Sequence, residues 1–330
     1  MNPIFKKSTA RALGLALGMS LAFASQAQTA APAWPTKPVK VIVNFPAGGA
    51  ADQLARALSQ PLQEALGQPF VIDNRGGSGG NIGGDAVAKS APDGYTLLMS
   101  SGGMVSVNPH IYPKMPFDPA KDLVPVAATA RVLVYLVVRA DSPVKDFAGL
   151  LSDLKAHPGK RSFGTPGNGS SPHLATEMMK SQTGTFALHV PYRGAAPALT
   201  DLLAGQIDFA FDPGIAVPHI KAGKLRLLAV GSPARSPLFP DVPTLDELGV
   251  KGFDADTVFG LYAPAGTPAA IVDRVNAEVN RALALPAVKE RILALGGVPA
   301  PMTPAQFHDK AAEDSRRFGA IIRERKIVGD

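Results

Sequence analysis

Two turns rich in small residues stand where a strand gives way to a helix, and both could bind an anion. The first, Phe45 to Asp52, follows the apolar run Val39–Val43 and contains Gly48 and Gly49. Glycines let a backbone turn tightly and approach a ligand. The helix that follows would direct unpaired N–H groups and the positive end of its dipole over the turn. This pattern suits a carboxylate, although an ordinary strand–helix turn shows it as well.

The second turn, residues 165–173, holds hydroxyl groups and a histidine. Ser170, Ser171 and His173 are close enough in sequence to suggest a secreted serine hydrolase. However, there is no G-x-S-x-G elbow, and closeness in sequence is not the geometry of a catalytic triad. The simpler interpretation makes Ser171 the N-cap of a helix with Pro172 at its first position. The hydrolase stays open as an alternative.

Three charged residues near these turns are candidate ligand contacts. Asp52 could meet an amine, but an acid in a first helical turn more often caps free N–H groups. Arg193 follows a predicted strand and could bind a carboxylate with two hydrogen bonds, or face solvent. Asp212 ends an apolar strand, where an unpaired buried charge is costly, so it either orders a loop or touches a ligand.

The composition excludes several classes of protein. The chain has no cysteine, so thiol catalysis and Cys-ligated metals are excluded. Its six histidines show no metal-ligand spacing, and the glycines of residues 74–84 do not fit G-x-G-x-x-G. We therefore expect no metal and no cofactor. Lys and Arg are scattered along the chain, and this gives little support to nucleic-acid binding.

The first 27 residues are typical of a secretory signal. Lys6, Lys7 and Arg11 precede the apolar stretch 13–24, and Ser25-Gln26-Ala27 offers small residues for cleavage after Ala27. Loss of these three basic residues from 33 leaves 30 against 27 acidic ones, or +3. The apolar stretch is too short to span a bilayer, and no later stretch is long enough. We expect an exported, soluble protein.

Strands and helices alternate along the remaining chain, which indicates an α/β fold with mostly parallel sheets. An apolar strand at 132–138 leaves the first domain, and another at 259–263 returns to it. Pro61 predicts a kink or a restart of the first helix near Ser59, because proline lacks an N–H and crowds the preceding turn. Helices are expected at 268–285, 286–295 and 304–325. Ligands of such sheets lie beyond the C-terminal strand ends, so the two turns predict a cleft between two lobes.

Many short motifs resemble, in the same order, the Bug (TctC-like) family of substrate-binding proteins, which serve tripartite tricarboxylate transporters. The resemblance covers nearly all of the mature chain that would follow cleavage after Ala27. The motifs are Phe45–Gly49 with Asp52, Asn74-Arg75, Ala91–Leu98, Gly167–Gly169, Ser171–Leu174, Val190–Gly194, Pro197–Leu202, Pro218–Arg226, Arg235–Pro237, Pro240–Thr244 and Ala263–Pro268.

The resemblance implies a periplasmic binding protein of the type II-like fold, which closes two lobes on a small carboxylate. Lobe 1 would be residues 28–134 and 258–330, and lobe 2 residues 135–257, with hinges near Val134 and Phe259. Such a protein would be a monomer in the periplasm that docks on the large and small membrane subunits of its transporter. It would have no catalytic residue. The expected ligand contacts are Phe45, Gly48, Gly49, Ala50, Ala51, Asp52, Ser101, Gly102, Thr165, Ser170, Ser171, Arg193 and Asp212.

Two departures from the family pattern bear on the ligand. Ala50-Ala51 stands where the family often has a hydroxyl residue, and Val258 where it commonly has Trp. Fewer polar contacts and a missing ring would favour a bulky or aromatic carboxylate over aspartate or glutamate. A receptor that reports the same ligand to a membrane sensor kinase remains a further alternative to transport.

Overall fold

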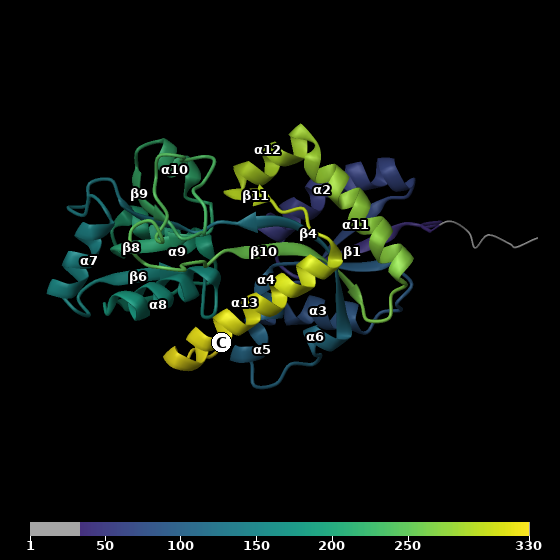
Figure 1. Ribbon diagram of the computed structural model, residues 1–330, viewed down its shortest axis with the longest axis horizontal. Coiled ribbons are helices and arrows are strands. Elements are labelled where there is room, and N and C mark those ends of the chain that lie inside the picture. Colours follow the sequence, from purple (N-terminus) through teal and green to yellow (C-terminus); the bar gives the residue numbers. More distant parts are fainter. Residues whose placement is uncertain (1–33, 330) are drawn as a thin grey trace, which may run out of the picture. The chain divides into compact units, whose positions relative to one another are not determined.

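The computed structural model describes residues 34–329, and the chain from Lys37 onward forms one compact unit. The predicted signal peptide lies outside the described residues. Among the residues that are described, no helix has both the length and the apolar character needed to cross a membrane. The unit contains two β-sheets with helices on both faces (Figure 1).

The six-stranded sheet is built from both ends of the chain, in the order β11-β4-β10-β3-β1-β2. β1 pairs in parallel with β2 and β3, whereas β10 runs antiparallel to β3 and β4. The strands are β1 (Val39–Val43), β2 (Phe70–Asn74), β3 (Thr96–Ser100), β4 (Leu123–Val132), β10 (Thr257–Pro264) and β11 (Gly297–Pro299).

The five-stranded sheet comes from the middle of the chain, in the order β7-β6-β8-β5-β9. β6 pairs in parallel with β7 and β8, and β5 runs antiparallel to β8 and β9. The strands are β5 (Tyr135–Arg139), β6 (Ser162–Thr165), β7 (Leu188–Pro191), β8 (Phe209–Asp212) and β9 (Leu225–Val230).

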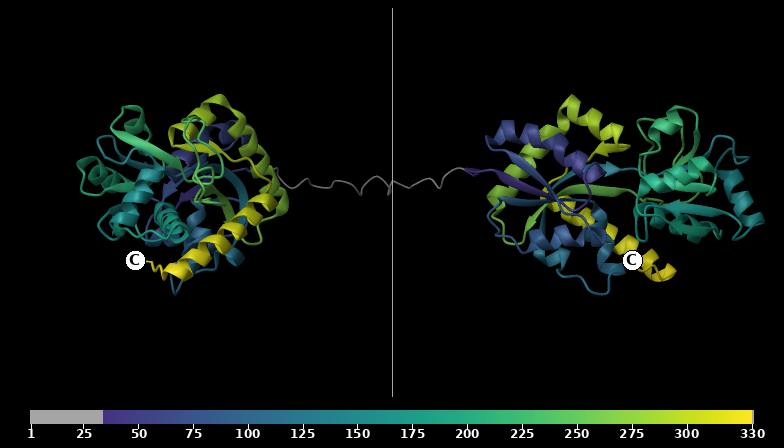
Figure 2. Two further views of the ribbon diagram at one scale, coloured as in Figure 1. Left: turned by 60° about the vertical axis from the view of Figure 1, so that its left-hand side comes forward. Right: turned by 180° about the vertical axis from the view of Figure 1, so that it is seen from behind.

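Helices cover both faces of each sheet (Figures 1 and 2). On the six-stranded sheet these are α2 (Ala50–Leu66), α11 (Ala269–Ala284) and α12 (Pro286–Ala294), and on the other face α3 (Asn81–Ala88), α4 (Gly102–Ser106), α5 (Asn108–Ile111), α6 (Pro119–Asp122) and α13 (Pro304–Arg325). On the five-stranded sheet these are α7 (Phe147–Ala156) and α8 (Ser171–Thr183), opposite α9 (Ala195–Ala204) and α10 (Val217–Lys221).

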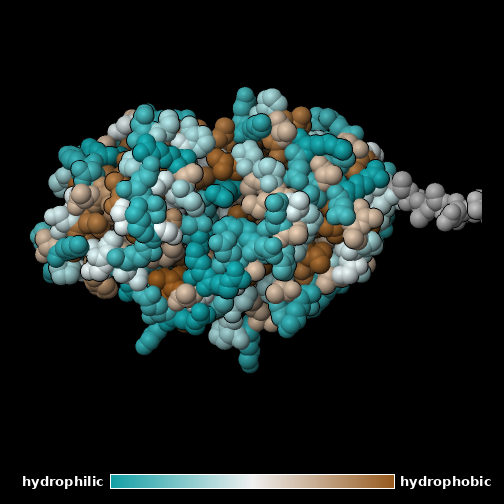
Figure 3. Space-filling model, in the orientation of Figure 1, coloured by the Kyte–Doolittle hydropathy of each residue, from teal (hydrophilic) through white to brown (hydrophobic). Residues whose placement is uncertain are grey.

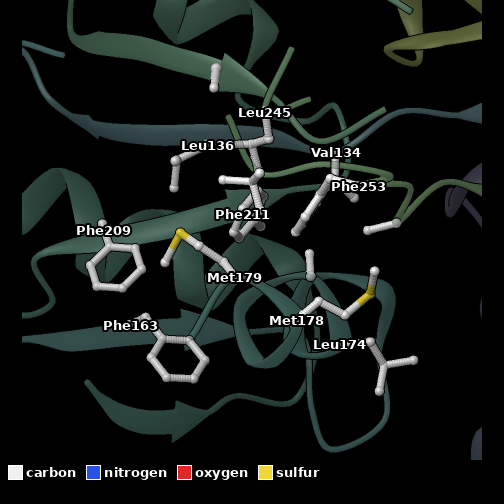
Figure 4. Packing of buried hydrophobic residues seen from close by; sticks show 14 of the residues in the cluster. Val134, Leu136, Phe163, Leu174, Met178, Met179, Phe209, Phe211, Leu245 and Phe253 are labelled. Carbon is white, nitrogen blue, oxygen red and sulfur yellow. The ribbon is translucent and has the colours of Figure 1, made fainter. Parts of the chain in front are cut away.

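The core follows the two-residue period of the strands. Leu136 and Val138 of β5 face α7 and α8, while Tyr135 and Val137 face α9 and α10. The first cluster contains Phe163, Phe209, Phe211 and both methionines of α8 (Figure 4). It continues without a break to the end of α13, which contacts both α4 and α8. Packing therefore joins α13 to the helices of both sheets.

The structure differs from the sequence-based expectations in three places. The sheets are mixed, because the strands that carry the chain between the sheets run antiparallel to their neighbours. The predicted strand 132–138 is interrupted at Leu133–Val134, because Val132 ends β4 and Tyr135 begins β5. The rest of β4, which starts at Leu123, was not predicted from the sequence. α2 does not restart near Ser59 but continues as one helix through Pro61, because a missing N–H removes only a single bond of the ladder.

Candidate functional site

In both sheets, strand pairing places the C-terminal ends of strands beside the two segments that connect one sheet to the other. In the six-stranded sheet, Ser100 at the end of β3 pairs with Gly260 near the start of β10. In the five-stranded sheet, Asp212 at the end of β8 pairs with Tyr135 at the start of β5. The loops after β1, β3, β6 and β8 therefore lie at the edges where the chain crosses from one sheet to the other.

The loop after β6 and the helices after β3 also touch directly. A Cβ atom on Gly169 would lie 2.5 Å from Cδ1 of Ile111 at the end of α5, and 3.4 Å from Val107. Gly169 has a φ of +72°, which an L-residue rarely adopts. The loop that follows β6 thus packs against the six-stranded half of the protein where only glycine fits.

Asp52 holds the turn after β1 in shape. Its Oδ2 accepts the amide of Gly48 at 2.9 Å and Nε of Arg56 at 2.9 Å, and its Oδ1 accepts Nδ2 of Asn74 at 3.0 Å. The same Asn74 Nδ2 donates to the carbonyl of Phe45 at 3.2 Å. Burial opposes ionisation, but these hydrogen bonds and the charge of Arg56 keep the pKa of Asp52 below its ordinary value. Asp52 is therefore an ionised anchor within the turn.

Of the four backbone amides from Gly48 to Ala51, two have an acceptor within the turn and two have none among the described residues. Gly48 donates to Asp52, and Gly49 donates to the carbonyl of Pro46 at 3.3 Å. Ala50 and Ala51, the first two residues of α2, have no acceptor for their amides among the described residues. They stand at the positive end of a helix of 17 residues, and a negatively charged ligand is the natural acceptor there.

Ser101 and Gly102 follow β3 at the same edge. Ser101 is half-buried and precedes α4 without a capping bond from its side chain. Gly102 is buried, and a Cβ atom there would lie 2.8 Å from the carbonyl oxygen of Val258. Val258 itself is 2% exposed and packs in the core beneath the sheet, so its small side chain does not widen the edge.

The turn after β6 is braced by its own hydroxyl groups and by His189 of β7. Thr165 Oγ1 lies 2.6 Å from Nε2 of His189 and also bonds to Gly167. Ser170, one residue earlier than expected, is the N-cap of α8: its Oγ accepts the amide of His173 and donates to Gly167. Ser171 is the first helical residue and is half-buried.

The arrangement of His173 counts against the hydrolase. Its Nδ1 accepts the amide of Gly169 at 3.2 Å, and its ring stacks on His189. Burial and the charge of Lys180 lower the pKa of His173 to about 4, which keeps the imidazole neutral. Ser170 Oγ is directed to a carbonyl instead of the ring, so the hydrogen bond between nucleophile and base that the chemistry requires is not formed.

Arg193 and Asp212 lie on either side of this turn. The backbone around Arg193 is bonded to it, because Tyr192 donates to Thr165 and Gly194 to Pro166. The Arg193 side chain is exposed and has no partner among the described residues. Asp212 is 4% exposed and accepts the amides of Gly214 and Ala216 on one oxygen. It orders the loop after β8 and borders a shallow surface hollow beside α9.

Sequence reasoning placed the two turns but missed the residues that shape them. Asn74 ties the first turn to Asp52, and His189 braces the second through Thr165. Asn44 supports the first edge by donating to Gly80 and to Ser100. For Asn74 the signal was its place in a family motif, and for Asn44 and His189 it was only their position, directly after β1 and within β7.

Comparisons with known proteins agree with this architecture. The chain matches the family described as "Tripartite tricarboxylate transporter family receptor" over residues 54–327. It is 40% identical over 301 residues to Protein BugT of Bordetella pertussis, which covers 90% of this chain and 92% of BugT. The solved structure of the periplasmic binding protein BugD is 32% identical with a TM-score of 0.78, covering 90% of this chain and all of that one.

Two further solved structures contain a carboxylate. Rpa4515 of R. palustris with adipate is 36% identical with a TM-score of 0.81, covering 90% of this chain and all of that one. MatC from Rhodopseudomonas palustris with bound malate is 34% identical with a TM-score of 0.76, covering 88% of this chain and all of that one.

The fold is therefore the two-lobed, type II-like fold of periplasmic binding proteins. The chain belongs to the tripartite tricarboxylate transporter family of receptors, whose members bind substrates and are not enzymes.

Proposed function

We propose that this protein is a periplasmic receptor that captures a small carboxylate between its two lobes and delivers it to a tripartite tricarboxylate transporter. The observation that carries the proposal is the pair of free amides of Ala50 and Ala51 at the start of α2, at the edge where the sheets connect. Bound adipate in Rpa4515 and bound malate in MatC support a carboxylate as ligand.

Each predicted contact receives a role. Ala50 and Ala51 donate to the carboxylate, while Phe45, Gly48, Gly49 and Asp52 shape the turn beneath it. Ser101 and Gly102 form one wall. The second lobe contributes Thr165, Ser170 and Ser171, with Asp212 ordering the neighbouring loop. Arg193, an exposed and unpartnered cation, is available for a second negative group of the ligand.

The ligand class that we propose is a dicarboxylate or an aromatic carboxylate. Methyl groups at Ala50 and Ala51 offer no hydroxyl donor, so affinity depends on main-chain amides and on apolar contact. Because Val258 is buried in the core, it adds no room for an aromatic ring. The preference for an aromatic ligand therefore depends on Ala50 and Ala51, whereas Arg193 favours a ligand with a second carboxylate.

Delivery to the large and small membrane subunits of the transporter is proposed from the family. A monomer in solution is proposed as well, because hydrophobic residues occur only as separate small patches on the face that Figure 3 shows. Location in the periplasm is proposed from the family and from the signal sequence expected at residues 1–27.

A thermal-shift and calorimetric screen tests the proposal. The panel is adipate, malate, aspartate, benzoate and phthalate, each with its uncharged amide as the control. The proposal requires a carboxylate that raises Tm, while its amide does not. At 100 times Kd, a ligand adds about 2.7 kcal/mol to the free energy of unfolding, which is easily detected. Equal binding of acid and amide would contradict the proposal.

A further inference from the structure

The segment that returns the chain from the five-stranded sheet to β10 carries a buried carboxyl group with an unusual environment. Asp256, immediately before β10, is 1% exposed. Its Oδ1 accepts a hydrogen bond from Ser232, which lies just after β9 of the other sheet. Its Oδ2 has no hydrogen-bond partner within residues 34–329. The nearest cation, Nε of Arg131 on β4, is 3.6 Å away, too far for a hydrogen bond.

The other cations near Asp256 are already paired with neighbouring acids. On α13, Lys310 lies 3.3 Å from Asp254 and 2.9 Å from Asp314. Arg317 on the same helix bonds to both of these carboxylates. The cluster at this crossing thus brings α13 and the connecting segment together by charge, whereas Asp256 has only the longer contact with Arg131 and no hydrogen bond from a cation.

The physical consequence concerns the charge of Asp256. Burial, and next the nearby charge of Asp254, raise the pKa of Asp256 to about 8, against the weaker opposing effects of Ser232, Arg131 and Arg317. Tyr135 of β5, whose hydroxyl is within reach of the charge of Asp256, stays neutral, because burial is the main cause that raises its own pKa to about 12. A proton on Oδ2 removes the cost of an unpaired buried charge.

We propose that Asp256 is a proton-bearing hinge residue, neutral in this arrangement of the two sheets, whose ionisation loosens the contact between the crossing segment and Ser232. Ionised Asp256 would be stabilised by water or by a closer approach of Arg131, and in the proposal the crossing segment moves away from Ser232 to admit one of them. In this proposal, the position of one lobe relative to the other therefore changes with pH. This inference rests on the crossings themselves and holds whatever the ligand is.

The chain has no cysteine, so two introduced cysteines can be spin-labelled without background. Gln60→Cys on α2 and Lys155→Cys on α7 are exposed positions beside different sheets. Electron–electron distance measurements on the ligand-free protein between pH 6 and 9.5 test the proposal. We expect the distance distribution to change with a midpoint near pH 8, and Asp256→Asn, which cannot ionise, to abolish the change.

Two further variants complete the test. Asp273→Asn removes an exposed acid of α11 and should leave the pH response intact. Arg131→Met removes the nearest cation and should move the midpoint to higher pH. Circular dichroism verifies that each variant folds, and Asp256→Ser replaces Asp256→Asn if the latter does not. A pH response that persists in the Asp256 variant, an unchanged midpoint in Arg131→Met, or no response in the parent would each overturn the proposal.

Discussion

Oδ2 of Asp52 accepts the amide of Gly48 at 2.9 Å, so an acid in the first turn of α2 closes the loop that leads into its own helix. The bond consumes one of the amides that the sequence offers to an anion. It also holds the turn that leads, through Gly49, to the amides of Ala50 and Ala51. The side chain of Asp52 thus shapes the turn at which we propose that the carboxylate of a ligand binds.

Replacement of Asp52 by Ala should destabilise the protein and weaken carboxylate binding together. The change leaves the amide of Gly48 without its acceptor and Nδ2 of Asn74 with the carbonyl of Phe45 alone, which costs about 1–3 kcal/mol of the free energy of unfolding. Urea denaturation and calorimetry measure the two effects. Glu64→Ala, an exposed acid on the same helix, is the control and should change stability by less than about 0.5 kcal/mol. Equal effects of the two variants would contradict the role given to Asp52.

The lowered pKa of Asp52 also predicts how the stability of the protein falls in acid. Because the hydrogen bonds and the charge of Arg56 hold this pKa below its ordinary value of 3.8, the stability from Asp52 is complete above pH 3.8 and is lost as pH falls through the lower, folded value. Wild-type stability should therefore fall more steeply than that of Asp52→Asn below about pH 4. Parallel pH profiles would show that the carboxylate contributes nothing.

Asp212→Asn should raise stability at neutral pH. Burial raises the pKa of Asp212 to about 6, so the unfolded chain releases this proton earlier and the folded state loses stability as pH rises from about 4 through 6. The amide oxygen of Asn still accepts from Gly214 and Ala216, without the charge. We expect a gain of up to ~3 kcal/mol at pH 7 and none at pH 3, measured by denaturant unfolding. A loss at pH 7 would show that the ionised form is required.

Gly169→Ala tests the contact between the loop after β6 and α5. An alanine there adopts a rare φ and meets Ile111 at 2.5 Å, so strain and overpacking together should cost about 2–4 kcal/mol. Gly223→Ala is the matched control: its φ is +68° and no atom lies within 4 Å, so only strain of about 1 kcal/mol is expected. If Ile111→Ala does not reduce the cost of Gly169→Ala in a double-mutant cycle, the contact is not the cause.

The sequence predicted those helices and strands whose formation depends mainly on residues close together in the chain. The α13 helix spans 304–325 as expected, because Thr303 and Gln306 form a capping box and its apolar residues recur at helical spacing. The β4 strand was missed, because Pro125 and Thr129 interrupt its apolar run and its partners in β10 and β11 come more than 100 residues later.

The site was predictable as two turns and not as a hydrogen-bonded network. Glycines at 48 and 49 indicate a turn, but nothing local shows that Asn74, 22 residues beyond Asp52, shares its carboxylate. For the same reason Asp256 attracted no attention in the sequence. Its unusual environment arises from Ser232, Arg131 and Asp254, which only the folded chain brings together.

The central claim, that main-chain amides at the start of α2 hold the ligand, is tested most directly by Ala50→Pro. Proline is favoured at the first helical position, and Gly49 before it already has an extended backbone, so the change removes one N–H with little harm to the helix. Ala269→Pro makes the same change at the start of α11, distant in sequence from the turn. For the carboxylate selected by the screen, we predict that Ala50→Pro raises Kd about 10- to 100-fold, as expected for a hydrogen bond to a charged group, while Ala269→Pro does not. An unchanged Kd in Ala50→Pro would contradict the account.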